Sequence, residues 1–500
     1  MNNIDYVFHR FLSISLKMLF LIPLIGSVLY LLYLKNYNNL LLLVFCFFIS
    51  IILIVVSNYL LKNDYKNSLI ITIILIVAFL IRFLWFDKIN AIPISDFKQM
   101  FTSAEDFSNG ATYMFKNYSY FARFPHMSIT VLYFSLIMKV FSAPLIAIRF
   151  INVIFSMLNV ILIFFISEEI FQSKKKSIWI LLISSIYPTM IIYNNVYCSE
   201  NMAMPLLLLS VLMFFKGMNP NIKNKLLFFS ISGLSLSAMH LFRPLGYVMI
   251  IAYIMYIFIY LKEKIKLKII KSSLIIVMFI IPYVIVSYTL MELDITENPL
   301  WHPMEPLSVS VLKSTNIESK GAWNQEDYDL VNKYYKDYDN LDKVSKETIK
   351  QRLITTPKIK LLCFYTFKYG KQWSSGDFGG IYWSKLEINQ AYNSDIIANK
   401  YGRAPIKIID NLQICTQIFH IIILIYSYIG LYKNKEIRNL KIDFFYIMFC
   451  GLSLQCLLME AQDRYTYPFS WIFIILAIAA FDKNNVSSNV NGNGGENGGF

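Results

Sequence analysis

The stretch SLIITIILIVAFLIRFLWF, residues 68–86, runs directly into DKINAIPISDF, residues 87–97, and this junction decides the fold class. The first part is a continuous apolar run, long enough to cross the hydrocarbon core of a bilayer as a helix. The second part carries Asp96 just beyond the boundary of that run. Because an ionisable group at a membrane boundary is costly to bury, we expect Asp96 to face water or a functional cavity.

Apolar runs of the same kind recur along the chain of 500 residues, 56% of which are hydrophobic. Runs of about 17 to 25 apolar residues predict an all-α polytopic membrane protein and exclude a soluble one. A membrane β-barrel is excluded as well, because its strands alternate apolar and polar residues. We predict about twelve spans (11–13), near 12–34, 39–61, 68–86, 145–167, 177–194, 202–215, 226–242, 245–261, 271–290, 408–432, 440–459 and 466–481.

The charge of the chain indicates its orientation in the membrane. The net charge is +14, which in a soluble protein would suggest nucleic acid as a partner. In a membrane protein, Lys and Arg gather instead in cytoplasmic loops, so no nucleic-acid partner is expected. If residues 128–143 lie along the membrane surface without crossing it, nearly all short-loop Lys and Arg fall on one side. That side, with both termini, is predicted to be cytoplasmic; its connections are 62–67, 168–176, 216–225, 262–270 and 433–441.

The opposite, extracytoplasmic face is predicted to hold the functional segments. An N-terminal membrane region, residues 1–290, includes a catalytic first outer loop at 87–144. Residues 291–407 are polar and too long for a simple loop, so they predict a small outer domain. That domain ends in an interfacial helix near 359–373, where apolar and cationic residues alternate. The remaining parts are C-terminal membrane helices at 408–481 and a disordered cytoplasmic tail at 482–500.

Several residues with useful chemistry share this outer face. Asp96 lies in the first outer loop and Glu200 in the turn at 197–201, while Arg243 and Arg464 are cations in outer segments that otherwise hold few. Cations on the outer face are exceptions to the positive-inside rule, by which Lys and Arg gather in cytoplasmic loops, and they suggest an anionic partner. A carboxylate that removes a proton from a hydroxyl, beside cations that neutralise a departing phosphate, fits sugar transfer from a polyprenyl-phosphate.

The order of these motifs resembles the GT-C superfamily of membrane glycosyltransferases, in particular the protein O-mannosyltransferase and lipid A aminoarabinose transferase branch. The family has a Ser-Asp-Glu element in its first outer loop. In this chain Phe97 stands in place of the second acid of that element, and Glu105 or Asp106 is the candidate to supply the missing carboxylate. The matching elements are Pro93 to Asp96, Phe124-Pro125-His126, Arg149, Tyr187-Pro188, Ser199-Glu200-Asn201, Arg243-Pro244, and Arg464-Tyr465 with Pro468.

The resemblance implies transfer of a sugar from a polyprenyl-phosphate-linked donor to an acceptor at the outer face, with inversion at the anomeric carbon and Asp96 as general base. The acceptor would be a cell-envelope glycan, a lipid or a protein. Neither a cofactor nor a metal is expected, because no His and Cys cluster and no glycine-rich loop is present. The candidate catalytic residues are Asp96, Glu200 and Asp106, and the candidate ligands of the lipid phosphate and donor are Arg123, His126, Arg243, Lys368, Arg464 and Tyr465.

Other interpretations of these residues stay open. Asp96 could cap the helix that follows it, and Arg243 and Arg464 could reach lipid headgroups. Tryptophans such as Trp383 could simply mark the membrane interface. As whole-protein alternatives, a polysaccharide polymerase or ligase of the O-antigen type has a similar span count and a large outer loop, and a lipid-linked saccharide flippase would be non-enzymatic.

Overall fold

The computed structural model describes residues 3–34, 67–384, 404–437 and 439–481, and these residues form helices and connections without a strand. The membrane helices and their neighbours are α1 (Asn3–Tyr33), α3 (Asn67–Lys88), α4 (Ser95–Ser108), α5 (Tyr120–Arg123), α6 (Ser128–Val140), α7 (Pro144–Phe171), α8 (Lys174–Ile186), α9 (Pro188–Ile192), α10 (Glu200–Met218), α11 (Lys225–Phe242), α12 (Gly246–Tyr260) and α13 (Ile265–Glu292). The later helices are α14 (Leu307–Ser314), α15 (Gln325–Tyr334), α16 (Tyr338–Thr355), α17 (Lys358–Ser374), α18 (Gly380–Ser384), α20 (Ala404–Ile437), α21 (Leu440–Leu458) and α22 (Trp471–Ala479). Short 3-10 helices are η2 (Tyr113–Phe115), η3 (Pro125–Met127), η4 (Tyr193–Asn195) and η5 (Asp463–Phe469).

The predicted spans that fall within the described residues coincide with helix. Eight helices there are long and apolar enough to cross a membrane, or up to ten if each of two bent helix pairs is one span. Four of the twelve predicted spans are not among these eight helices. The predicted span 39–61, like the predicted tail, lies outside the described residues, and the predicted span 177–194 is one of the two bent pairs, α8 followed by α9 and η4. Helix α12 is apolar but shorter, and the predicted span 466–481 is divided between η5 and α22. The all-α membrane class is confirmed.

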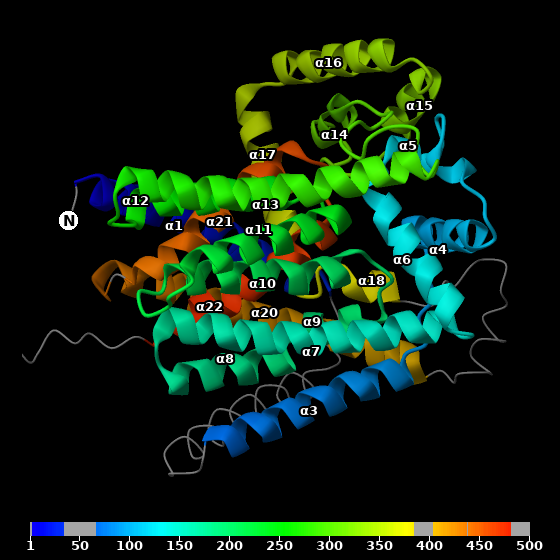
Figure 1. Ribbon diagram of the computed structural model, residues 1–500. Helices are drawn as coiled ribbons and strands as arrows, with labels where there is room; N and C mark the ends of the chain where they lie inside the picture. Colours follow the sequence, from blue (N-terminus) through cyan, green and yellow to red (C-terminus); the bar gives the residue numbers. More distant parts are fainter. Residues whose placement is uncertain (1–2, 35–66, 385–403, 438, 482–500) are drawn as a thin grey trace, which may run out of the picture.

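The long helices lie alongside one another, and the segment 87–144, predicted to be the first outer loop, gathers at one end of them (Figure 1). In the middle of the bundle, α10 packs against α7 and α11, and α11 packs against α13. Near the N-terminus, α1 packs against α17 and α20. Helices α4 and α6 pack together at the end of the bundle away from the N-terminus. Because Arg464 of η5 donates to Asp96 of α4, residues of the two halves of the chain meet at that end.

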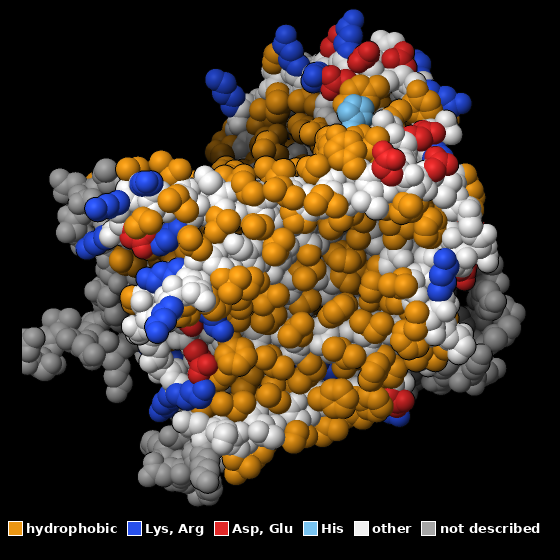
Figure 2. Space-filling view, viewed as in Figure 1, with side chains coloured by type: hydrophobic (Ala, Val, Ile, Leu, Met, Phe, Trp, Pro, Cys, Tyr) orange, Lys and Arg blue, Asp and Glu red, His pale blue; other side chains and the backbone are white. Residues whose placement is uncertain are grey.

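The surface of the bundle fits a lipid environment. Figure 2 shows hydrophobic side chains over the flank that includes α7 and α13, with Lys and Arg gathered at the end where the N-terminus lies and over the region of α14–α16. Large apolar side chains point outward from this flank, among them Ile154 and Phe165 on α7 and Ile280 and Ile285 on α13. A surface of this kind is stable when lipid tails cover it.

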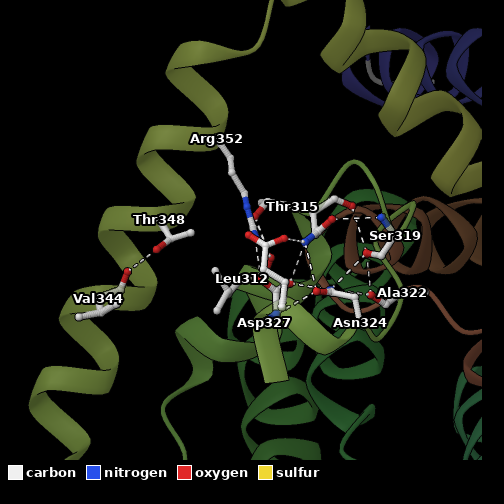
Figure 3. A network of polar contacts seen from close by, with 11 residues as sticks. Leu312, Thr315, Ser319, Ala322, Asn324, Asp327, Val344, Thr348 and Arg352 are labelled. Carbon is white, nitrogen blue, oxygen red and sulfur yellow. Dashed lines mark hydrogen bonds and ion pairs between the residues drawn. The ribbon is translucent and has the colours of Figure 1, made fainter. Parts of the chain in front are cut away.

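The α14–α16 segment forms a small core of its own at the edge of the bundle (Figure 1). Val309, Leu312, Val331 and Leu341 are buried against one another there. A polar network holds the three helices together, as Figure 3 shows: Arg352 of α16 donates to the buried carboxylate of Asp327 on α15 at 2.6 Å. Asn324, the N-cap residue of α15, donates to the same carboxylate at 2.7 Å. This compact segment lies within the stretch that the sequence assigns to an outer domain.

One buried arginine donates hydrogen bonds to backbone carbonyls at a break in a membrane helix. Helix α8 ends at Ile186, and the chain bends by 49° into α9, which begins at Pro188. Proline has no backbone N–H, so the carbonyl four residues earlier, in Ser184, lacks its usual helical donor. The fully buried Arg82 of α3 replaces that donor. Its acceptors are the carbonyls of Ser185 at 2.8 Å, Ala78 at 3.1 Å and Ser184 at 3.3 Å, and the hydroxyl of Ser156 at 2.8 Å.

We expect Arg82→Met to lower the free energy of unfolding by about 2–3 kcal/mol, because backbone carbonyls that Pro188 leaves open lose their donor inside the membrane region. Thermal unfolding of the purified protein in detergent measures the loss. The exposed Arg10→Met is the matched control and should leave the unfolding temperature unchanged. In a Pro188→Ala background, where Ser184 regains an amide donor, Arg82→Met should cost less; equal losses in both backgrounds would contradict this account of Arg82.

The predicted orientation has a direct test in a variant from which the native cysteines are removed. Asn109, after α4, and Asn221, between α10 and α11, are both exposed in the structure and lie on opposite predicted sides. Cysteine at position 109 should react with an impermeant thiol reagent added outside whole cells, and cysteine at position 221 should react only after permeabilisation. The reverse pattern would invert the predicted topology.

Candidate active site

Asp96 lies in the first turn of α4, where an acidic side chain is favoured by the partial positive charge of the helix N-terminus. The preceding residue, Ser95, has a left-handed backbone (φ 50°) that turns the chain sharply out of the extended Ile94. No side chain caps this helix, so the capping interpretation of Asp96 is wrong. Its carboxylate instead accepts from Arg464 Nη2 at 2.9 Å and from the hydroxyl of Tyr120 at 3.2 Å.

Arg464 is a buried cation that is only partly satisfied. It belongs to η5, and 3% of its side chain is exposed. Its guanidinium lies over the rings of Trp383 at 4.7 Å and Phe97 at 4.8 Å, distances at which a cation is attracted to an aromatic face. Within the described residues, its Nε and Nη1 have no hydrogen-bond partner. Phe97, which replaces the second acid of the family motif, therefore gives this arginine a ring face in place of a second charge.

The charge state of Arg464 follows from its neighbours. Burial alone would lower the pKa of its guanidinium, but Tyr465, Glu200 and Asp96 together more than offset burial, so the pKa is raised. Arg464 is therefore a fixed positive charge at every pH at which the protein is folded.

A second acid and arginine pair lies beside the first. Glu200, in the first turn of α10, has a side chain that is 1% exposed and lies 2.8 Å from Arg243 Nη2. Arg243 directly follows α11, and its Nε has no hydrogen-bond partner in the described part of the chain. The hydroxyl of Ser199 donates weakly to Glu200 at 3.4 Å. Arg243 is thus held by one contact and keeps a further donor open.

Tyr465 joins the two pairs. The guanidinium of Arg243 lies 4.9 Å from the centre of its ring, and that of Arg464 lies 5.4 Å from it. Asp96, Arg464, Arg243 and Glu200 therefore form one cluster around a single aromatic ring. They come from α4, η5, the end of α11 and the start of α10, which are far apart in sequence. The structure brings together these five residues predicted from the sequence.

His126 belongs to the same neighbourhood. Desolvation, followed by the nearby charges of Arg243 and Arg464, lowers the pKa of its imidazole to about 3. His126 is therefore neutral at physiological pH. In this state it offers one N–H donor to an anion but no point charge.

Three of the predicted site residues, Asp106, Arg123 and Lys368, form their contacts outside the cluster around Tyr465. Asp106 lies ten residues beyond Asp96 on α4, about 15 Å along the helix, and accepts from the hydroxyl of Tyr113 at 2.6 Å. Arg123 is paired with the buried Glu305, at 2.5 Å from Nη2 and 3.0 Å from Nε. Neither residue touches the cluster around Tyr465.

Lys368 of α17 is fully buried, and its ammonium uses all three of its donors within the protein. It donates to the Ser314 hydroxyl and the Leu457 carbonyl, each at 2.8 Å, and to the Ser314 carbonyl at 3.2 Å. Burial lowers its pKa to about 8. These contacts tie α17 to α14 and α21 and leave no donor open for a phosphate.

Two residues that contact the cluster were not predicted from the sequence. Tyr120 was not singled out, because one tyrosine among 34 carries no signal by itself. Trp383 was interpreted as a marker of the membrane interface, yet it lies against Arg464 and packs edge-on against Phe97 at 4.9 Å. In the described residues, no three His, Cys, Asp or Glu side chains are grouped to hold a metal ion, and Cys198, Cys363, Cys450 and Cys456 are free thiols.

Comparison with known proteins gives a family match for part of the chain. Residues 129–286 match a family described as dolichyl-phosphate-mannose-protein mannosyltransferase. This range includes Glu200 and Arg243 and excludes Asp96 and Arg464. No curated protein matches the chain significantly.

Two solved structures from Archaeoglobus fulgidus are similar: an oligosaccharyltransferase in the apo form, and the oligosaccharyltransferase AglB in complex with an inhibitory peptide and a dolichol-phosphate. Each is 12% identical with a TM-score of 0.45, and the matches cover 84% and 83% of this chain. The chain spans half the length of either archaeal protein. The family match, found in an all-helical chain with many candidate membrane spans, confirms the resemblance to the GT-C glycosyltransferases and supports a membrane glycosyltransferase.

Proposed function

We propose that the protein transfers a sugar from a polyprenyl-phosphate-linked donor to a hydroxyl of an acceptor at the extracytoplasmic membrane face, with Asp96 as general base. The observation that carries the proposal is a buried arginine with open donors beside a carboxylate. Arg464 binds Asp96 through Nη2 alone, and its Nε and Nη1 are without partners in the described residues. Buried donors without partners are costly, so this arrangement favours a ligand with several strong acceptor oxygens.

A phosphate matches the open donors. Arg464 offers Nε and Nη1, and Arg243, whose guanidinium also lies near the Tyr465 ring, offers Nε. The planar fork of arginine binds two phosphate oxygens at once, which a lysine cannot do. His126 adds one neutral N–H donor nearby. Both guanidiniums lie near the Tyr465 ring, Arg243 at 4.9 Å and Arg464 at 5.4 Å from its centre, and in the proposal one phosphate contacts both.

The carboxylate of Asp96 is placed for the proton transfer. Its side chain is 29% exposed, so an acceptor hydroxyl can reach it from outside the cluster. In the proposed step, Asp96 takes the hydroxyl proton as the acceptor oxygen bonds to the anomeric carbon of the sugar. The bond from that carbon to the phosphate oxygen breaks, and its electron pair leaves with the phosphate. Direct displacement on the face opposite the phosphate inverts the anomeric carbon.

The two arginines act on the departing group. As the sugar leaves, the lipid phosphate gains one negative charge, which Arg464 and Arg243 neutralise in a site with little water. Glu200 is nearly inaccessible, so we assign it the task of holding Arg243 in place and not the task of a base. The prenyl chain of the donor would lie among the membrane helices. The acceptor, whether cell-envelope glycan, lipid or protein, would approach past the predicted outer domain.

Asp96→Asn should reduce sugar transfer by a factor of about 10²–10⁴, because the amide cannot accept the hydroxyl proton but keeps the shape of the side chain. The measurement is release of labelled sugar from synthetic short-chain polyprenyl-phosphate sugars by purified protein in detergent. Asp87→Asn, at the exposed end of α3, is the matched control and should keep the full rate. Equal rates in Asp96→Asn and the unmodified protein would remove Asp96 as the base, and the absence of turnover with every donor would favour the polymerase or flippase alternatives.

Arg464→Lys should lower kcat/KM for the donor by about 10- to 100-fold although the positive charge is kept. Lysine lacks the planar fork and stacks less favourably between Trp383 and Phe97. Steady-state kinetics with the best donor of the panel measures the change, and the unfolding temperature shows that the variant is folded. An unchanged kcat/KM would exclude Arg464 from phosphate binding.

A further inference from the structure

Helix α5 places a contact of the proposed base but has little stability of its own. It is a single turn, Tyr120–Arg123, between Asn117, which has a left-handed backbone (φ 56°), and Pro125. One helical turn does not form by itself in solution, because closing the first turn fixes several residues for one hydrogen bond. The hydroxyl of Tyr120 nonetheless reaches Asp96 at 3.2 Å. Something outside α5 must therefore hold it in position.

The segment 294–305, which leads from α13 towards α14, supplies the support. It contacts the region around α5 at four places along its length. Three of these contacts are the ion pair from Lys116 to Asp294 at 2.7 Å, the bond from the Asn117 amide to Glu297 at 2.7 Å, and the bond from the Met304 amide to the Ala122 carbonyl at 3.0 Å. The fourth is the pair of Arg123 with Glu305.

The Arg123–Glu305 pair differs from the other ion pair in its burial. The side chain of Glu305 is 6% exposed and that of Arg123 is 17% exposed, whereas that of Asp294 is 86% exposed. The contact to Glu305 uses both Nε and Nη2 of Arg123, so the guanidinium has a fixed orientation. An exposed ion pair contributes little to stability, but a buried pair that loses one partner leaves the other charge uncompensated. The pair is therefore the firmest of the four attachments.

We propose that Glu305 is a positioning residue for Asp96, acting through Arg123 and the single turn of α5 that carries Tyr120. The inference rests on the proposed function for its kinetic consequence. It gives Arg123 a task other than binding the lipid phosphate: its ion pair with Glu305 fixes α5, and α5 fixes the hydroxyl that orients the carboxylate. A displacement of the base by about 1 Å is enough to slow a reaction by two orders of magnitude.

Glu305→Gln tests the relay. Loss of the charge should free α5 and lower kcat by about 10- to 100-fold, while KM for the donor stays within a factor of two because Arg464 and Arg243 are untouched. The control Asp342→Asn removes the acid of an exposed ion pair with Lys346 on α16 and should change neither constant. A rise in KM at constant kcat would overturn the proposal in favour of a donor-binding role for this pair.

The charge-swapped variant Arg123→Glu with Glu305→Arg separates the two roles of Arg123. If the pair positions α5, the swapped pair should recover at least a tenth of the unmodified kcat and exceed both single variants. If Arg123 binds the phosphate, the acid at position 123 repels it, and the double variant should be no better than Arg123→Glu alone. The second result would overturn the proposal.

Amide hydrogen exchange gives a readout that needs no substrate. In Glu305→Gln, residues 117–124 should exchange at least ten times faster than in the unmodified protein, while the amides of α10 and α11 keep their protection. Unchanged exchange in residues 117–124 would overturn the relay whether or not the protein turns over a polyprenyl-phosphate sugar. Faster exchange without turnover of any donor would leave α5 dependent on Glu305 and reject only the proposed function.

Discussion

A positive charge buried between a carboxylate and aromatic rings is the constraint on which the site depends. Arg464 is placed among Asp96, Phe97 and Trp383 with donors to spare. Burying an arginine with open donors is unfavourable unless the surroundings compensate for lost water. Here one carboxylate and two ring faces compensate in part, and the remaining donors stay ready for an anion. The site therefore contains a buried guanidinium whose hydrogen-bond donors are only partly used by the described residues.

Two other buried cations in the chain, Arg82 and Lys368, have their hydrogen-bond donors paired within the protein. Arg82 makes four hydrogen bonds, three of them to backbone carbonyls, and closes the break before Pro188. Lys368 uses every donor of its ammonium on α14 and α21. Both are as deeply buried as Arg464, so burial alone does not separate a structural cation from a functional one. The number of side-chain donors without partners in the described residues does differ: Arg464 has two, Nε and Nη1, whereas Arg243 and Arg149 each have Nε alone.

Sequence reasoning reached the membrane class and the central cluster because both follow from simple rules. Apolar runs must be helices in lipid, and cations at the outer face contradict the charge rule unless they bind something. The second rule singled out Arg243 and Arg464, and Asp96 was singled out separately as an ionisable group at a membrane boundary. The bonding of Lys368 and of Arg123 could not be predicted, since their partners, the Leu457 carbonyl and Glu305, are distant in sequence and carry no pattern of their own. The contact of Trp383 with Arg464 could not be predicted for the same reason.

The proposed relay from Glu305 to Asp96 joins parts of the chain that lie far apart in the sequence. Tyr120 belongs to one helical turn, and that turn is contacted by residues at the start of the segment that the sequence assigns to the outer domain. In the proposal, a small displacement of the 294–305 segment shifts the hydroxyl that contacts Asp96, because a single helical turn has little stability of its own. The geometry of proton transfer is sensitive to shifts of this size, so we expect the rate to depend on residues well outside the cluster around Tyr465.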